Sequence, residues 1–571
     1  MLASSLAVTY CIRGLGGEEE GSRNVGIGTY MEMMKRLSRT VPVCRRQSVF
    51  GDDWLDSISR LLHTTDIPQK PLRMTSNRRT RLTPTASTTS ANQLSADLTT
   101  ATKTKEVPEI QPRDYKLYSK SHIPGILNTY LENRTDLDPL SYVAAASVLP
   151  MRTNNYVVED LIDWSSVPND PIFQLVFPQP GMLSEEGLAD VRDLLRRGVT
   201  RTVLRETVEK LRAELNPHPA NQKTLNVPRV NGQELPGMQH KYRETVLFFP
   251  SEGQFCQAFC TYCFRWAQFT SVGSQQQFQS TDGDLLRAYL RTNKCVSDVL
   301  FTGGDPMVMT ARQWQRYLLP LINDPTLDHV ATVRIGTKSI GYWPYRYISD
   351  SDSDDILWLL ERVVKSGKHL AIMSHFSHPR ELSTPVAQEA IRRIQMTGAT
   401  IRAQAPLIRH VNDNPQTWAD MWRLQVRLGI IPYYMFVERD TGAKHYFEVP
   451  LAEAVKIYQE ASSSISGIGR TVRGPSMSAS PGKLHVLGTA TLQGEKVFVL
   501  KFLQGRNPAW TENPFFAQYD PKASWLSDLR PAFGEKKFFF EDELEEIERA
   551  ETSSGALYPY PEGMEYKNMM L

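Results

Sequence analysis

Three cysteines lie close together in the middle of the chain, at Cys256, Cys260 and Cys263. Thiolates are soft ligands that suit iron–sulfur clusters or zinc. Structural zinc usually needs a fourth ligand from a second paired motif, and Cys295 stands alone. A cubane held by only three cysteines keeps one iron free to bind another molecule. The C-x3-C-x2-C triplet therefore predicts a 4Fe–4S cluster with one open iron, and leaves zinc or three unligated core cysteines as alternatives.

A second chemical feature is the glycine turn Gly303-Gly304-Asp305-Pro306, which follows the apolar run 298–302. Glycines let the backbone approach a ligand closely and expose its N–H and C=O groups. Taken alone, such a turn is as consistent with a purely structural role as with ligand binding.

These features sit in a stretch where short β-rich apolar runs alternate with helical ones. We expect strands at 245–249, 298–302, 331–335, 369–374, 400–405 and 430–436, and helices at 311–322, 355–366, 385–397 and 417–428. Such alternation implies a parallel sheet covered by helices, either a full or partial (β/α) barrel or an open doubly wound sheet. In both folds the reactive groups gather at the carboxyl ends of the strands.

The whole chain divides by composition and residue pattern into four parts. We expect residues 1–110 to form a disordered extension, because the stretch 75–105 is rich in Ser, Thr and Ala and lacks a repeated apolar face. Residues 111–235 are helical in pattern, with Ser184 as a plausible N-cap. We expect the catalytic α/β part at 236–490 and a C-terminal extension at 491–571, with a charged helix near 541–549.

Overall composition narrows the class of protein. A net charge of +2 in 571 residues favours neither nucleic acid nor membrane as a partner. Six cysteines in a chain of this length do not form a disulfide scaffold. We expect a cytoplasmic or mitochondrial protein, because arginine, serine and threonine near the N-terminus faintly resemble a mitochondrial presequence while Glu18, Glu19 and Glu20 count against one.

C-x3-C-x2-C is the signature of the radical S-adenosylmethionine (SAM) enzymes, and further segments resemble the lysine 2,3-aminomutase family. These segments are 148–156, 161–164, 256–265, 302–306, 334–336, 375–379, 411–413, 432–434 and 481–483. The resemblance implies a full or partial (β/α) barrel with the cluster loop after its first strand. It also implies an isomerase with three cofactors, a 4Fe–4S cluster, SAM and pyridoxal 5′-phosphate.

Site residues follow from the same resemblance, position by position. Lys483 occupies the place of the lysine that holds pyridoxal, and Arg265 that of the arginine that binds the substrate carboxylate. The remaining cofactor-binding positions are Gly303, Gly304 and Asp305 for SAM, and Gln404, Lys241, Arg243 and His375 for pyridoxal phosphate.

The implied reaction converts an α-amino acid, lysine or a relative, to its β-isomer. Lysine-specific members hold the distal ammonium with two aspartates, but here an ungapped match places Arg439, beside Asp440, and Ser476 at those positions. A buried cation without counter-charge is costly, which puts lysine as the substrate in doubt. The alternatives are another substrate on the same scaffold, such as a peptidyl lysine, and a non-catalytic iron–sulfur protein. The expected partners are a flavodoxin- or ferredoxin-like electron donor and further copies of the chain.

Overall fold

A computed structural model describes residues 110–554, apart from 133, 135, 217–225, 231–232, 271–277 and 440. All of these residues belong to one compact unit, Lys105–Leu571. The predicted disordered extension falls on residues outside this described part.

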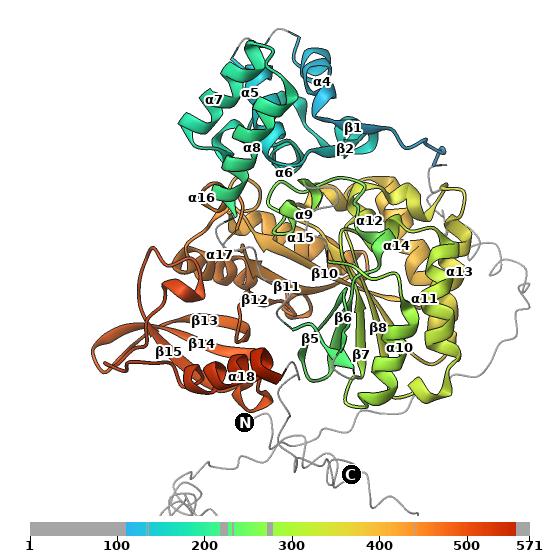
Figure 1. Cartoon of the computed structure of the whole chain (residues 1–571), viewed down its shortest axis with the longest axis vertical. Helices are drawn as coiled ribbons and strands as arrows, with labels where there is room; N and C mark the ends of the chain where they lie inside the picture. The colour runs from blue at the N-terminus through green and yellow to red at the C-terminus, as the bar shows by residue number, and fades with distance from the viewer. Residues whose placement is uncertain are drawn as a thin grey trace, which may run out of the picture. The chain divides into compact units, whose positions relative to one another are not determined.

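An eleven-stranded sheet forms the centre of the described chain, with its strands in the order β15 to β5 (Figure 1). Strands β6 to β12 are parallel to one another, whereas β5 and β13 to β15 join antiparallel. The strands are β5 (Met238–Tyr242), β6 (Thr245–Phe248), β7 (Asp298–Phe301), β8 (Thr332–Thr337), β9 (His369–His375), β10 (Thr400–Leu407), β11 (Ile431–Val437), β12 (Arg473–Ser478), β13 (Gly482–Leu492), β14 (Glu495–Gly505) and β15 (Pro514–Gln518). The predicted α/β fold is confirmed, and the described strands leave the sheet open rather than closed into a full barrel.

Helices connect the parallel strands, and their starts are fixed by polar caps. Thr310, Thr384 and Asn414 each accept a hydrogen bond from a backbone N–H in the first turn of the helix that follows. The helices are α9 (Trp266–Thr270), α10 (Gly283–Thr292), α11 (Ala311–Asn323), α12 (Ser339–Tyr342), α13 (Ser353–Lys365), α14 (Pro385–Met396), α15 (Pro415–Arg427), α16 (Lys444–Phe447) and α17 (Leu451–Ser463).

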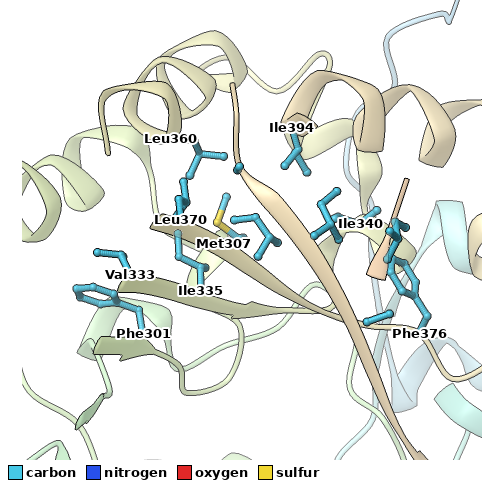
Figure 2. Packing of buried hydrophobic residues seen from close by; sticks show 14 of the residues in the cluster. Phe301, Met307, Val333, Ile335, Ile340, Leu360, Leu370, Phe376 and Ile394 are labelled. Carbon is cyan, nitrogen blue, oxygen red and sulfur yellow. The ribbon is translucent and has the colours of Figure 1, made fainter. Parts of the chain in front are cut away.

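The main core lies between the sheet and these helices (Figure 2). Alternate residues of each strand face it, so Val333 and Ile335 of β8 are buried there. Arg334 and Gly336 of the same strand consequently project from the opposite face of the sheet. On that opposite face Arg334 forms an ion pair with Asp298 of β7.

The described N-terminal region contributes a short antiparallel strand pair and five α-helices. They are β1 (Leu117–Ser119), β2 (Arg152–Asn154), α4 (Ile123–Tyr130), α5 (Pro139–Val148), α6 (Pro171–Val176), α7 (Glu185–Arg196) and α8 (Arg201–Leu215). Ser184 caps α7 by accepting from Gly187 N, as predicted. The apolar pattern of 183–214 is divided between α7 and α8, because Gly198 adopts a φ of +61° that ends the first helix.

Strands β13 to β15 extend the sheet beyond its parallel part and pack with α18 (Glu541–Ser554), where we predicted a charged helix. None of the helices in the described residues combines the length and apolar character needed to cross a bilayer.

Candidate active site

The three cysteines lie on the loop between β6 and α9, at the carboxyl end of the first parallel strand. Burial raises the pKa of all three thiols, that of Cys263 to about 12. Uncharged thiols are therefore favoured until a metal replaces the proton. This chemistry fits a site that becomes charged only when it is loaded with metal.

Hydrogen bonds from the N-terminal region hold this cysteine loop in place. Asn154, which is fully buried, donates through Nδ2 to Gln257 O at 3.3 Å and to Tyr342 O at 3.0 Å. Further bonds run from Tyr115 Oη to Gln257 O, from Phe259 N to Arg152 O and from Thr261 N to Leu175 O. The segment that carries the cysteines is thus shaped by residues a hundred positions earlier in the chain.

The glycine turn after β7 packs directly against the residues that precede Cys256. Asp305 N donates to Phe255 O at 2.6 Å. A Cβ at Gly304 would lie 2.6 Å from Phe255 O, closer than such contacts occur, so only glycine permits this approach. Gly303 and Gly304 therefore lie beside the cysteine loop, where predicted SAM binding requires them.

The side chain of Asp305 is occupied by the protein itself. Its carboxylate accepts from Thr337 Oγ1 at 2.7 Å, Lys338 N at 2.8 Å and Met307 N at 3.0 Å. Burial raises the pKa of this carboxyl. Asp305 thus fixes the glycine turn to the end of β8, and any contact with a cofactor would come from its backbone.

Lys483 lies at the start of β13, with its amino group over two aromatic rings of β11. Its Nζ is 4.4 Å from the ring centre of Tyr434 and 5.8 Å from that of Phe436. Burial, reinforced by Arg334 and Arg473, lowers the pKa of this amine to about 7. An amine that is neutral near pH 7 can form an imine with an aldehyde such as pyridoxal.

Gln404 and His375 occupy neighbouring positions in the sheet, and Gln404 is also in register with Tyr434. Burial and the charge of Lys338 lower the pKa of His375 to about 3, so the ring is neutral. Its Nε2 is buried and lacks a hydrogen-bond partner in the protein. An orphaned polar atom at the carboxyl end of β9 fits contact with a bound group.

The two predicted phosphate-binding residues, Lys241 and Arg243, have different described contacts. Lys241 donates through Nζ to Ala479 O, in the turn that leads to Lys483. The side chain of Arg243 lies beside the Cys295 thiol. Cys295 belongs to the connection between α10 and β7. Lys241 is therefore near the predicted pyridoxal site, whereas the described contact of Arg243 is with another part of the chain.

Arg265 is a buried guanidinium that forms no ion pair with the described residues. It donates to Gln268 Oε1 at 2.9 Å and stacks 4.5 Å above the ring of Phe249, while its Nε lacks a partner. Burial lowers its pKa to about 10. A buried cation with spare donors is suited to a carboxylate supplied by a ligand.

One acidic residue near the cysteines escaped the sequence analysis. Glu438 directly follows β11 and lines a small hollow with Cys263 and Trp266, and burial raises its pKa well above the usual range. Its position just after a predicted parallel strand was the available signal.

The two positions at which lysine-specific relatives have aspartates differ in surroundings. Arg439 lies 5.1 Å from the ring of Phe264, and Ser476 is buried in β12 with its hydroxyl donating to Arg473 O. Asp440 lies outside the described residues.

The donor set suits the predicted cluster, SAM and pyridoxal. Within the described ranges, no three His, Cys, Asp or Glu side chains converge on a point as they would around a single metal ion. A cubane instead presents separate iron corners to its thiolates, so its ligands need not converge. The partnerless atoms of Arg265 and His375, together with the neutral amine of Lys483, are suited to the organic cofactors and substrate.

Comparisons with known proteins agree with this arrangement. No family model matches the chain. A protein of Aquifex aeolicus, provisionally named an L-lysine 2,3-aminomutase, is 28% identical over 68% of this chain and 89% of its own length.

L-lysine 2,3-aminomutases of Escherichia coli and Haemophilus influenzae are 28% and 27% identical. These matches cover 41% and 42% of this chain, and 63% and 65% of the relatives, just under two thirds of their lengths. Among solved structures, the match to a radical SAM methyltransferase from Sphaerobacter thermophilus covers 50% of this chain and 92% of that chain at 14% identity, with a TM-score of 0.31. By its sequence relatives, the chain resembles the L-lysine 2,3-aminomutases.

Proposed function

We propose that this protein is an isomerase, a radical SAM and pyridoxal-dependent 2,3-aminomutase that converts an α-amino acid, lysine or a relative, to its β-isomer. The observation that carries the proposal is Lys483, whose buried amine has a pKa of about 7 and lies over Tyr434 on the sheet that also positions the cysteine loop. An ordinary surface lysine is protonated at neutral pH and cannot form an imine.

Each remaining group has a role that its surroundings support. Cys256, Cys260 and Cys263 would hold the cluster, and the turn at Gly303 and Gly304 would contact SAM through its backbone. When bound, the cluster and SAM supply a carbon radical that abstracts hydrogen, and pyridoxal supplies a π system over which the unpaired electron spreads.

The residues of the chain position the substrate and keep its surroundings dry. Arg265 offers two parallel N–H donors to the substrate carboxylate. The neutral His375 and the adjacent Gln404 offer polar contacts without an added charge. Aromatic rings around Lys483 keep water away from the amine, which preserves its neutral form and protects reactive intermediates.

Anaerobic reconstitution with iron, sulfide and pyridoxal phosphate provides the test. The reduced protein is incubated with SAM and a panel of amino acids, and the products are analysed for 5′-deoxyadenosine and β-amino acids. We expect a β-amino acid from at least one substrate, and none from Cys260→Ser or Lys483→Ala. Cleavage of SAM without any β-amino product would contradict the aminomutase assignment and favour another substrate on the same scaffold. A low-potential one-electron donor protein and self-association remain parts of the proposal to be tested separately.

A further inference from the structure

Cys260 differs from the other two cysteines in having a tyrosine hydroxyl against its sulfur. The Oη of Tyr342 lies 3.6 Å from Cys260 Sγ, within hydrogen-bonding range for sulfur. In the free thiol the S–H can donate to this oxygen. A metal-bound thiolate has no proton, so the tyrosine hydroxyl becomes the donor and the sulfur the acceptor.

Tyr342 is held at this position by its backbone and by its ring. Its carbonyl accepts from Asn154 Nδ2, the same amide that fixes the cysteine loop. The amino group of Lys338 lies 4.5 Å from the centre of the Tyr342 ring. The short helix α12 thus presents a hydroxyl to Cys260, and Lys338, which precedes this helix, places a cation against the same tyrosine ring.

Lys338 is buried and held in one position by several acceptors. It forms an ion pair with Glu381 and lies 3.4 Å from both Ser377 Oγ and His375 O. Glu381 is fully buried, and its other oxygen accepts from Ser377 N and His378 N. A Cβ at Gly341 would lie 2.6 Å from Glu381 Oε2, so the glycine lets α12 approach this pair.

The two charges of the ion pair differ in their contacts. Lys338 Nζ lies against the ring of Tyr342, whose hydroxyl contacts Cys260 Sγ, whereas Glu381 is bonded to the Lys338 amine and to Ser377 N and His378 N. A hydrogen bond to a ligand sulfur and a positive local field both favour the cluster state that carries one more electron. Tyr262 adds a second hydroxyl near the same sulfur, shared with Ser377 Oγ at 3.2 Å.

We propose that Tyr342 and Lys338 are positioning residues that raise the reduction potential of the cluster through Cys260, so that a one-electron donor can reduce it. The inference rests on the cluster of the proposed function, but not on pyridoxal or on the choice of substrate. In the step concerned, one electron passes from a flavin or iron–sulfur donor to the oxidised cluster, and no bond is broken.

The test is a redox titration of the reconstituted full-length protein, followed by electron paramagnetic resonance of the reduced cluster. At a fixed potential near the wild-type midpoint, we expect Tyr342→Phe to lower the ratio of reduced to oxidised cluster by about threefold to tenfold. The matched control is Tyr345→Phe, which removes a hydroxyl that faces Arg113 rather than a cysteine. Equal ratios in wild type and Tyr342→Phe would overturn the proposal, as would a folded Tyr342→Phe protein that no longer binds a cluster.

A double variant tests the effect of the Lys338–Glu381 ion pair, and a vibrational measurement tests the hydrogen bond of Tyr342 to Cys260. Lys338→Met with Glu381→Gln removes both charges without stranding either, and we expect it also to lower the reduced fraction. Resonance Raman spectra in H2O and D2O should show an isotope-sensitive Fe–S band in the wild type whose isotope shift is smaller in Tyr342→Phe. Absence of a cluster in the wild-type protein would instead contradict the proposed function, which separates the two failures.

Discussion

The amino group of Lys483 on β13 lies 4.4 Å from the ring centre of Tyr434 on β11, across the intervening strand β12. β13 is antiparallel to β12 and to β14. Lys483 therefore comes from a hairpin that lies outside the alternating strand–helix units, yet its amine contacts a side chain of the parallel strand β11. A catalytic lysine on this hairpin depends on the C-terminal part of the chain for its placement.

The pH dependence of imine formation tests this environment. Because the pKa of the Lys483 amine is lowered from 10.5 to about 7, the neutral fraction increases as the pH rises through about 7. We expect the imine absorbance with pyridoxal phosphate to rise with a midpoint near pH 7, and to be lost in Lys483→Ala. Lys501→Ala is the control, since Lys501 on the neighbouring strand is paired with Glu512. A midpoint near 10 would show that the amine is solvated.

Gly304→Ala tests the contact between the glycine turn and the cysteine loop. The added Cβ would lie 2.6 Å from Phe255 O and must push the two loops apart. We expect SAM affinity of the reconstituted protein to fall by about tenfold or more, measured by equilibrium binding. Gly125→Ala in α4, where no atom lies within 4 Å of the added Cβ, should leave SAM affinity unchanged.

The six parallel strands expected at 245–249, 298–302, 331–335, 369–374, 400–405 and 430–436 could be predicted from the sequence, as could the helices between them. Each segment has a regular spacing of apolar residues that is typical of its type of secondary structure. The strand predicted at 400–405, for example, is β10 at Thr400–Leu407. The hydroxyl of Tyr342 against Cys260 was not predictable, because it depends on a contact between residues 82 positions apart. The roles predicted for Lys241 and Arg243 stay predictions, because their described contacts, with Ala479 O and the Cys295 thiol, do not test phosphate binding.

Asn154→Ala tests whether the N-terminal region positions the cysteine loop. The amide is fully buried and bonds to Gln257 O, Tyr342 O and, through Oδ1, Val157 N. Removal leaves these groups without partners, so we expect a loss of about 1–3 kcal/mol in the free energy of unfolding. Iron and sulfide bound per chain should fall as well. Full cluster content with normal stability would rule out this role.

Removal of the positive charge of Arg439 tests the identity of the substrate. The guanidinium lies beside Phe264, which follows Cys263 in the chain, and would repel the distal ammonium of lysine. We expect weak turnover of lysine relative to neutral or acidic amino acids, and a rise of about tenfold in kcat/KM for lysine in Arg439→Ala. The exposed Arg427 at the end of α15 provides the control variant Arg427→Ala.

Substitution of Glu438 tests the effect of a negative charge on the same substrate preference. Its buried carboxyl lies near Cys263 and, as a carboxylate, would attract a cationic side chain. Burial raises the pKa of Glu438 and so favours the protonated carboxyl. A cationic side chain bound beside Glu438 should increase the fraction of the ionised carboxylate. Glu438→Gln should therefore reduce turnover of lysine more than that of neutral amino acids. Comparison with the double variant Glu438→Gln, Arg439→Ala distinguishes the effects of the two charges on lysine turnover. Robust lysine turnover by the wild type, unaffected by either substitution, would show that the distal ammonium is held elsewhere.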